Sequence, residues 1–101
     1  MRYHLVLQWS ASSVDDYDAM ISLENSLIEG LQDDEIEGHD FGSGEFNMFI
    51  RTNNPVRAFE SAKKILEIDD LLDNVRAAYR DIEFEKYTIL WPTSLSDFNV
   101  R

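Results

Sequence analysis

The residues with the most varied chemistry gather in one stretch, GHDFGSGEFN, at residues 38–47. It combines a histidine, carboxylates, a serine and an amide around a glycine-rich turn. As a metal site it offers His39 and Glu45, with His4 as a third ligand. Asp40 cannot join them, because strand alternation sends it to the face opposite His39. Scattered ligands of this kind form a weak pattern, so no metal is expected.

Two further chemistries fit the same stretch less well. Ser43, His39 and Asp40 have the residue types of a nucleophilic triad, but a nucleophile elbow leads into a helix and here a strand follows. The Gly-Ser-Gly amides resemble a phosphate cradle, but no helix start or lysine follows, and Asp40 with Glu45 would repel an anion. A structural turn whose glycines supply positive φ is the simpler interpretation.

Glu24 is a carboxylate within the apolar stripe of a predicted helix, so it is expected to face the sheet. A carboxylate buried without a partner is protonated more easily and can transfer that proton. An arginine, lysine, tyrosine or backbone amide beside it would instead hold it as a structural ion. The catalytic candidates are therefore His39, Glu45 and Glu24, each with a structural role as the alternative.

Periodicity and capping residues predict the elements that position these side chains. Strand alternation, helical spacing of apolar residues, and the Asn54-Pro55 helix start are the main signals. The predicted elements are a strand at 3–9, a helix at about 14–31, a hairpin at 36–52, a helix from 55 to about 67, a short helix at 71–79 and a strand within 82–91.

The hairpin has its best predicted register with a three-residue loop at residues 42–44. That loop pairs His39 with Asn47 on the outer face and lets the last glycine adopt a left-handed conformation. A two-residue loop at residues 42 and 43 would set Asp40 opposite Glu45, which is a like-charge pair.

The order β-α-β-β-α-β predicts an α+β domain with the ferredoxin-like, split βαβ fold. Four antiparallel strands would form the sheet, both helices would cover one face, and the extra short helix would precede the last strand. We expect one domain over residues 1–92 and a C-terminal tail over residues 93–101.

The charge of the chain is strongly one-sided. Its 101 residues include 20 acids and 9 bases, for a formal net charge of -11. Residues 1–50 hold 11 of the acids and 1 of the bases. This charge disfavours nucleic-acid binding and favours fast encounter with a basic partner. An acidic surface that only keeps the protein soluble is the alternative.

Other residue types narrow the function classes further. The chain has no cysteine, which excludes disulfides, thiolate metal sites and cysteine nucleophiles and permits a cytoplasmic location. No stretch approaches the roughly 18 apolar residues of a membrane span. We expect a cytoplasmic protein that binds neither membrane nor nucleic acid and needs no cofactor.

The uncovered face of the predicted sheet would carry large rings among polar groups. Such a face is typical of self-association, of a protein partner or of a shallow ligand groove. The predicted binding surface consists of His39, Phe41, Glu45, Asn47, Phe49, Arg51, Asp33, Asp34, Glu35 and Glu37. Asp15, Asp16 and Glu29 of the first helix would add to electrostatic steering.

Three segments, GHDFGSGEFNMFIRTNNP, AAYR and YTILWP, resemble a family of small bacterial proteins of unknown function. This resemblance spans most of the chain and implies a soluble bacterial protein. It carries over no site residue, because the family has no assigned activity. Size and acidity are also similar to those of immunity proteins that neutralise bacterial toxins.

Two functions from different classes follow from these observations. The first is a non-enzymatic binding module, a regulator or a toxin-immunity-like protein, that presents its acidic surface to a basic protein and can dimerise through the open sheet face. The second is a small enzyme or small-ligand binder with His39 as general acid or base. In it Glu45 or Asn47 would orient the histidine, and Glu24 would carry a second proton. Catalysis requires these groups to meet in a concavity. Of the two functions, the non-enzymatic binding module is the preferred one.

Overall fold

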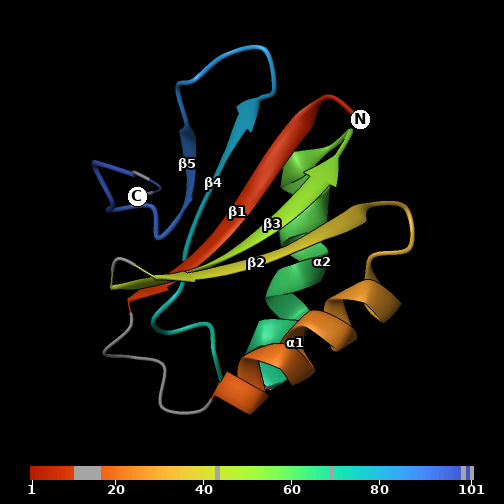
Figure 1. Cartoon of the computed structure of the whole chain (residues 1–101). Coiled ribbons are helices and arrows are strands. Elements are labelled where there is room, and N and C mark those ends of the chain that lie inside the picture. The colour runs from red at the N-terminus through yellow and green to blue at the C-terminus, as the bar shows by residue number, and fades with distance from the viewer. Residues whose placement is uncertain (11–16, 43, 69, 99, 101) are drawn as a thin grey trace.

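The chain forms a five-stranded antiparallel sheet with two helices on one face (Figure 1). The computed structural model describes residues 1–10, 17–42, 44–68, 70–98 and 100. Their elements are β1 (Tyr3–Ser10), α1 (Tyr17–Gly30), β2 (Glu35–Gly42), β3 (Glu45–Thr52), α2 (Pro55–Ile68), β4 (Arg76–Asp81) and β5 (Thr88–Trp91). The predicted α+β class is confirmed.

The strands lie in the order β2-β3-β1-β4-β5, so β1 is central and β2 and β5 are the edges. Alternation along β1 places Leu5, Leu7 and Trp9 toward the helices, and all three are 0% exposed. Val6 and Gln8 point to the opposite, open face and are also 0% exposed. The strand predicted at residues 3–9 is therefore confirmed, and it lies at the buried centre of the sheet.

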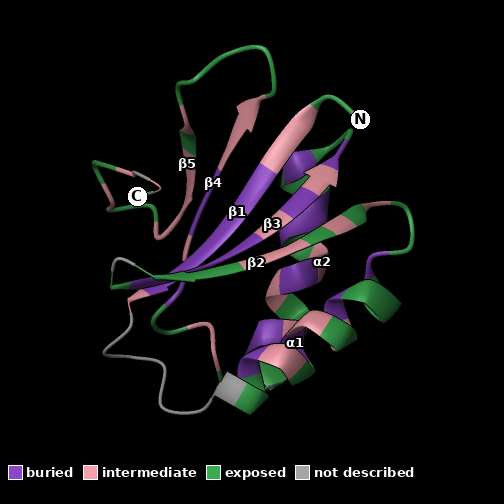
Figure 2. Cartoon of the chain, in the orientation of Figure 1, coloured by how far each residue is buried: buried purple, intermediate pink, exposed green. Residues whose placement is uncertain are grey.

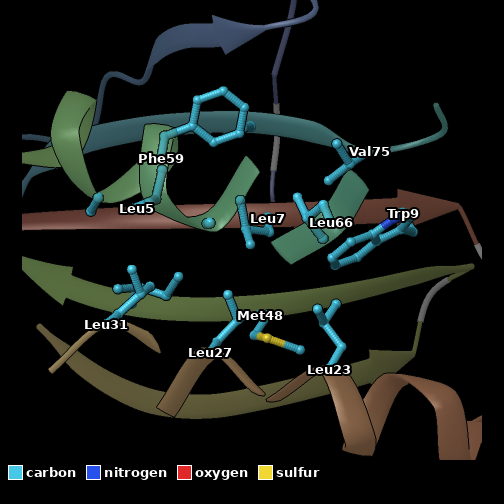
Figure 3. Close-up of a cluster of buried hydrophobic side chains, with 14 of the residues drawn as sticks. Leu5, Leu7, Trp9, Leu23, Leu27, Leu31, Met48, Phe59, Leu66 and Val75 are labelled. Atoms are coloured by element: carbon cyan, nitrogen blue, oxygen red, sulfur yellow. The ribbon is translucent and has the colours of Figure 1, made fainter. Parts of the chain in front are cut away.

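The hydrophobic core lies between the sheet and the helices (Figure 3). The helices contribute Met20, Leu23, Leu27, Leu31, Ala58, Phe59, Ala62 and Leu66. The apolar stripe of α1 differs slightly from the predicted one, because Leu23 is buried while Ile28 is 51% exposed. This rotation still leaves Glu24 beside the sheet.

Helix α2 begins as predicted. The side chain of Asn54 accepts a hydrogen bond from the backbone N–H of Arg57 at 3.1 Å, and Pro55 occupies the first helical position. These two residues satisfy or remove backbone donors that would otherwise lack partners.

The short helix predicted at residues 71–79 is wrong. Asp70 has a φ of 62°, and the N–H of Leu71 donates to the carbonyl of Leu66 at 2.9 Å, a pattern that ends a helix. The carbonyl of Leu71 then accepts from the indole N–H of Trp9 at 3.1 Å, which anchors the turn to β1. Residues 72–75 contain a further turn, and β4 begins at Arg76.

The last strand is only partly as predicted. β5 lies within the predicted range of 82–91, but it pairs with β4, and β4 takes the predicted place beside β1. The sheet therefore has five strands where four were predicted. Alanines such as Ala77 and Ala78 are weak strand formers, although both are 0% exposed here.

The radius of gyration is 12.4 Å, close to the roughly 13 Å of a compact chain of this length. The ring of Phe98, in the predicted tail, lies 5.1 Å from that of Tyr87. The domain boundary at residue 92 stays a prediction. Neither of the two described helices is long and apolar enough to cross a membrane.

Candidate functional site

A bulge divides β2, the edge strand that carries many of the predicted site residues. Ile36 pairs with Ile50 of β3. The next pair joins Gly38 to Phe49, which leaves Glu37 as an extra residue on β2. Gly38 has a φ of 132°, a conformation that residues with a Cβ rarely adopt. Because strand side chains alternate, the extra residue reverses the faces of every residue that follows it.

The predicted hairpin register is correct before the bulge, where Ile36 pairs with Ile50, and wrong after it. Gly42 pairs with Glu45, so the three-residue loop is wrong. His39 pairs with Met48 instead of Asn47, and it therefore lies on the helix face rather than on the open face.

Replacing Gly38 with alanine is expected to destabilise the protein by about 1–3 kcal/mol, because its φ of 132° disfavours a side chain. The added Cβ would meet no atom within 4 Å, so the cost is conformational. Gly42→Ala is the matched control, since Gly42 also has open space around it but no positive φ. Chemical denaturation of both variants measures the difference, and equal losses would contradict this account.

On the helix face, His39 meets Glu24 of α1. The Nδ1 atom of His39 lies 3.0 Å from Oε2 of Glu24, and the side chains are 25% and 17% exposed. An ionised carboxylate only accepts hydrogen bonds, so Nδ1 carries the proton. The imidazole stacks on Phe46 with a centroid distance of 5.4 Å. Glu24 thus faces the sheet as predicted, but its partner is a histidine and not one of the expected residue types.

On the open face, His4 lies between an acid and an arginine. Its Nε2 is 3.0 Å from Oε1 of Glu37, and its Nδ1 is 3.3 Å from Nη2 of Arg80. A guanidinium only donates hydrogen bonds, so Nδ1 accepts and the proton of Nε2 is donated to Glu37. The geometry therefore specifies a neutral imidazole.

Burial lowers the pKa of His4 below its usual 6.5, and the charges of Arg80 and Arg51 act in the same direction while Glu37 opposes them. Between the lowered pKa and 6.5 the unfolded chain binds more protons than the folded chain. The stabilisation that neutral His4 provides is therefore present above the usual pKa and is lost as the pH falls through the lowered pKa.

The His4→Gln variant is expected to lose less stability than the wild-type protein between about pH 7 and pH 5, because it lacks this titrating group. Urea denaturation at a series of pH values measures the free energy of unfolding of both proteins. Parallel pH profiles would show that His4 makes no such contribution.

The open face also carries a buried pair of polar side chains at its centre. The Gln8 side-chain N–H donates to Oδ1 of Asn47 at 3.0 Å, and neither residue is more than 1% exposed. Glu45 is 8% exposed, with Oε2 3.5 Å from Nη2 of Arg76. Since His39 lies on the other face, the predicted cluster of His39 with Glu45 and Asn47 is wrong.

The predicted aromatic pair is also divided between the two faces. Phe41 pairs with Phe46, so it lies on the helix face at the sheet edge, where it is 50% exposed. Phe49 pairs with Val6 on the open face and is half-buried. Arg51, opposite His4, shares that face.

Exposed acids follow β2 and the turn before it. Figure 2 shows β2 as exposed or half-buried over its length, whereas β1 and β3 are largely buried. We call four exposed residues the acidic edge: Asp33, Glu35, Glu37 and Asp40. A weak, exposed ion pair joins Asp33 to Arg57 at 3.4 Å. The acidic edge is thus a row of exposed carboxylates that follows the edge strand of the sheet.

The other predicted acids differ in position. Asp34 is half-buried, and Glu29 is exposed on α1. Asp15 and Asp16 lie outside the described residues.

The described residues contain no group of three or more His, Asp or Glu side chains placed to hold a metal ion. Among the described residues, one pocket of about 450 Å³ lies beside Arg2 and Asp81, and another of about 450 Å³ lies between residues 85–89 and residues 96–98 with Val100. Neither is lined by His39 or Glu24. The catalytic candidates therefore do not meet in either concavity.

The sequence interpretation missed the contact between Arg80 and His4 and the partner of Glu37. One signal was available, because an isolated glycine within a strand pattern often marks a bulge, and Gly38 is such a glycine.

No protein-family model, curated protein or solved structure matches this chain. The resemblances to a small bacterial family and to immunity proteins therefore stay predictions.

Proposed function

We propose that the protein is a non-enzymatic, protein-binding module of the bacterial cytoplasm, a regulator or a toxin-immunity-like protein, that docks a basic protein. The observation that supports this most is the acidic edge, three exposed carboxylates on the edge strand β2 and a fourth in the turn before it. A field of one sign speeds encounter with an oppositely charged partner. Phe41, half exposed on the same strand, offers an apolar contact that can be desolvated on docking.

The fold we propose for this module is ferredoxin-like, with β5 as an addition. The order β2-β3-β1-β4, antiparallel neighbours and two helices on one face agree with a split βαβ arrangement. β5 extends the sheet on the side away from β2, so β2 stays at an edge.

A homodimer through the open sheet face is a further proposal. The centre of that face, at Val6, Gln8 and Asn47, is already buried within one chain. A dimer would therefore use the rim of the face, where Phe49 and Arg51 are half-buried.

A small enzyme or small-ligand binder is the alternative, and the pair of Glu24 with His39 favours it. A carboxylate on Nδ1 fixes the tautomer and orientation of an imidazole, as general acid–base catalysis requires. Glu45 and Asn47, on the other face, cannot assist it.

The proposed function is tested by a pull-down from native lysate with the tagged full chain, at low salt and at about 0.5 M salt. We expect one stoichiometric basic protein at low salt that is lost at high salt, because screening weakens contacts between exposed charges. Capture of no basic protein at either salt concentration would contradict the proposal.

A further inference from the structure

The outer side of β2 is an edge of the sheet, where another strand can pair with it. Among the described residues, β2 pairs with β3 alone, so its other side presents backbone N–H and C=O groups. Beyond the bulge, the residues from Gly38 to Gly42 each pair in step with β3. This half of the strand is therefore regular and offers a uniform row of backbone groups.

Both histidines of the chain hold this strand in place. On one face His39 of β2 bonds Glu24 of α1, and on the other Glu37 of β2 bonds His4 of β1, each at 3.0 Å. The two contacts anchor residues on either side of Gly38 to different elements. An edge that is fixed before binding loses less conformational freedom when a partner pairs with it.

The two faces of β2 differ in chemistry. Asp40 pairs with Asn47 and therefore points to the open face, where Glu37 also lies. Phe41 points to the helix face and is 50% exposed. Side chains of an added strand would alternate in the same way, with one set beside the acids and the other beside the phenyl ring.

We propose that β2 binds an extended segment of a basic protein as an added strand, and that this segment alternates lysine or arginine with apolar residues. The inference deepens the proposed function and rests on it. Main-chain hydrogen bonds to the outer side of β2 would supply affinity, and the alternating side chains would supply specificity. The basic residues would lie beside Glu37 and Asp40, and an apolar residue beside Phe41.

The same features disfavour pairing between β2 and the β2 strand of a second copy of this chain. Two acidic edges brought together would oppose like charges, and the bulge at Glu37 interrupts pairing at one end. A basic segment removes the first obstacle, and the five residues beyond the bulge are long enough to avoid the second. The edge thus discriminates by charge between a partner and a copy of itself.

The test uses the isotope-labelled full chain and three capped peptides at low salt. The first alternates lysine with valine, the second is the same peptide with every backbone amide N-methylated, and the third has its lysines and valines in two blocks. We expect the first peptide to shift the amide resonances of residues 38–42 and to slow their hydrogen exchange. The other two should bind at least about tenfold more weakly, since they lack the donors or the alternation that strand addition needs.

Different outcomes separate this inference from the proposed function. Equal affinity for the alternating and N-methylated peptides, with shifts spread over α1 and unchanged exchange at residues 38–42, would overturn strand addition but not docking on an acidic surface. Equal affinity for the block peptide would overturn the required alternation. If no peptide bound, the acidic edge would attract no basic ligand, and both proposals would fail.

Discussion

Replacing Phe46 with alanine is expected to lower the free energy of unfolding by about 3–5 kcal/mol. Phe46 is 0% exposed, and its ring lies 6.1 Å from that of Trp9, 5.8 Å from that of Phe41 and 5.4 Å from that of His39. It therefore joins β1, β2 and β3, and through the bonded His39 it also supports α1. The truncation would leave a cavity where these elements meet.

Phe49→Ala is the matched control for this prediction. Phe49 lies on the same strand but is half-buried on the open face, so the same truncation should cost clearly less. Chemical denaturation of both variants gives the comparison. If Phe46→Ala cost no more than Phe49→Ala, Phe46 would not be the packing centre described here.

Neutralising the acids of β2 is expected to slow association with a basic partner at least about tenfold at low salt. The variant combines Glu35→Gln, Glu37→Gln and Asp40→Asn, all at exposed positions. Glutamine at position 37 keeps an oxygen that can accept the Nε2 proton of His4, so the fold should be retained. Stopped-flow or surface-binding kinetics with the captured partner measure the association rate.

The control variant combines Glu60→Gln, Glu67→Gln and Glu85→Gln, which are exposed acids away from the acidic edge. It changes the net charge by the same amount, and its association rate should fall less than about twofold. Similar slowing of both variants would mean that net charge, not the acidic edge, attracts the partner.

Local sequence patterns were sufficient for the elements with strong signals. Alternating apolar residues located β1, and the pair Asn54-Pro55 located the start of α2, because both patterns act within a few residues. β4 was not predicted, since Ala77 and Ala78 have low strand propensity and become a strand only through pairing with β1. Its burial is a tertiary effect that no local pattern contains.

Which residues meet at the candidate site depends on a shift of one residue in the register between β2 and β3. The left-handed conformation predicted for Gly44 is confirmed by its φ of 78°, and Glu24 faces the sheet as expected. The extra residue at Glu37 could not be derived from alternation, which assumes an unbroken strand. A slip of one residue moves His39 to the other face, and so it separated a predicted cluster and created the pair with Glu24.

The docking surface is tested most directly by hydrogen–deuterium exchange of the full chain with and without the captured basic partner. We predict slower exchange in residues 33–42, which include the acidic edge and the free side of β2. Slower exchange confined to β4, β5 or the residues after β5, with residues 33–42 unchanged, would contradict the proposal that the protein docks its partner along this edge.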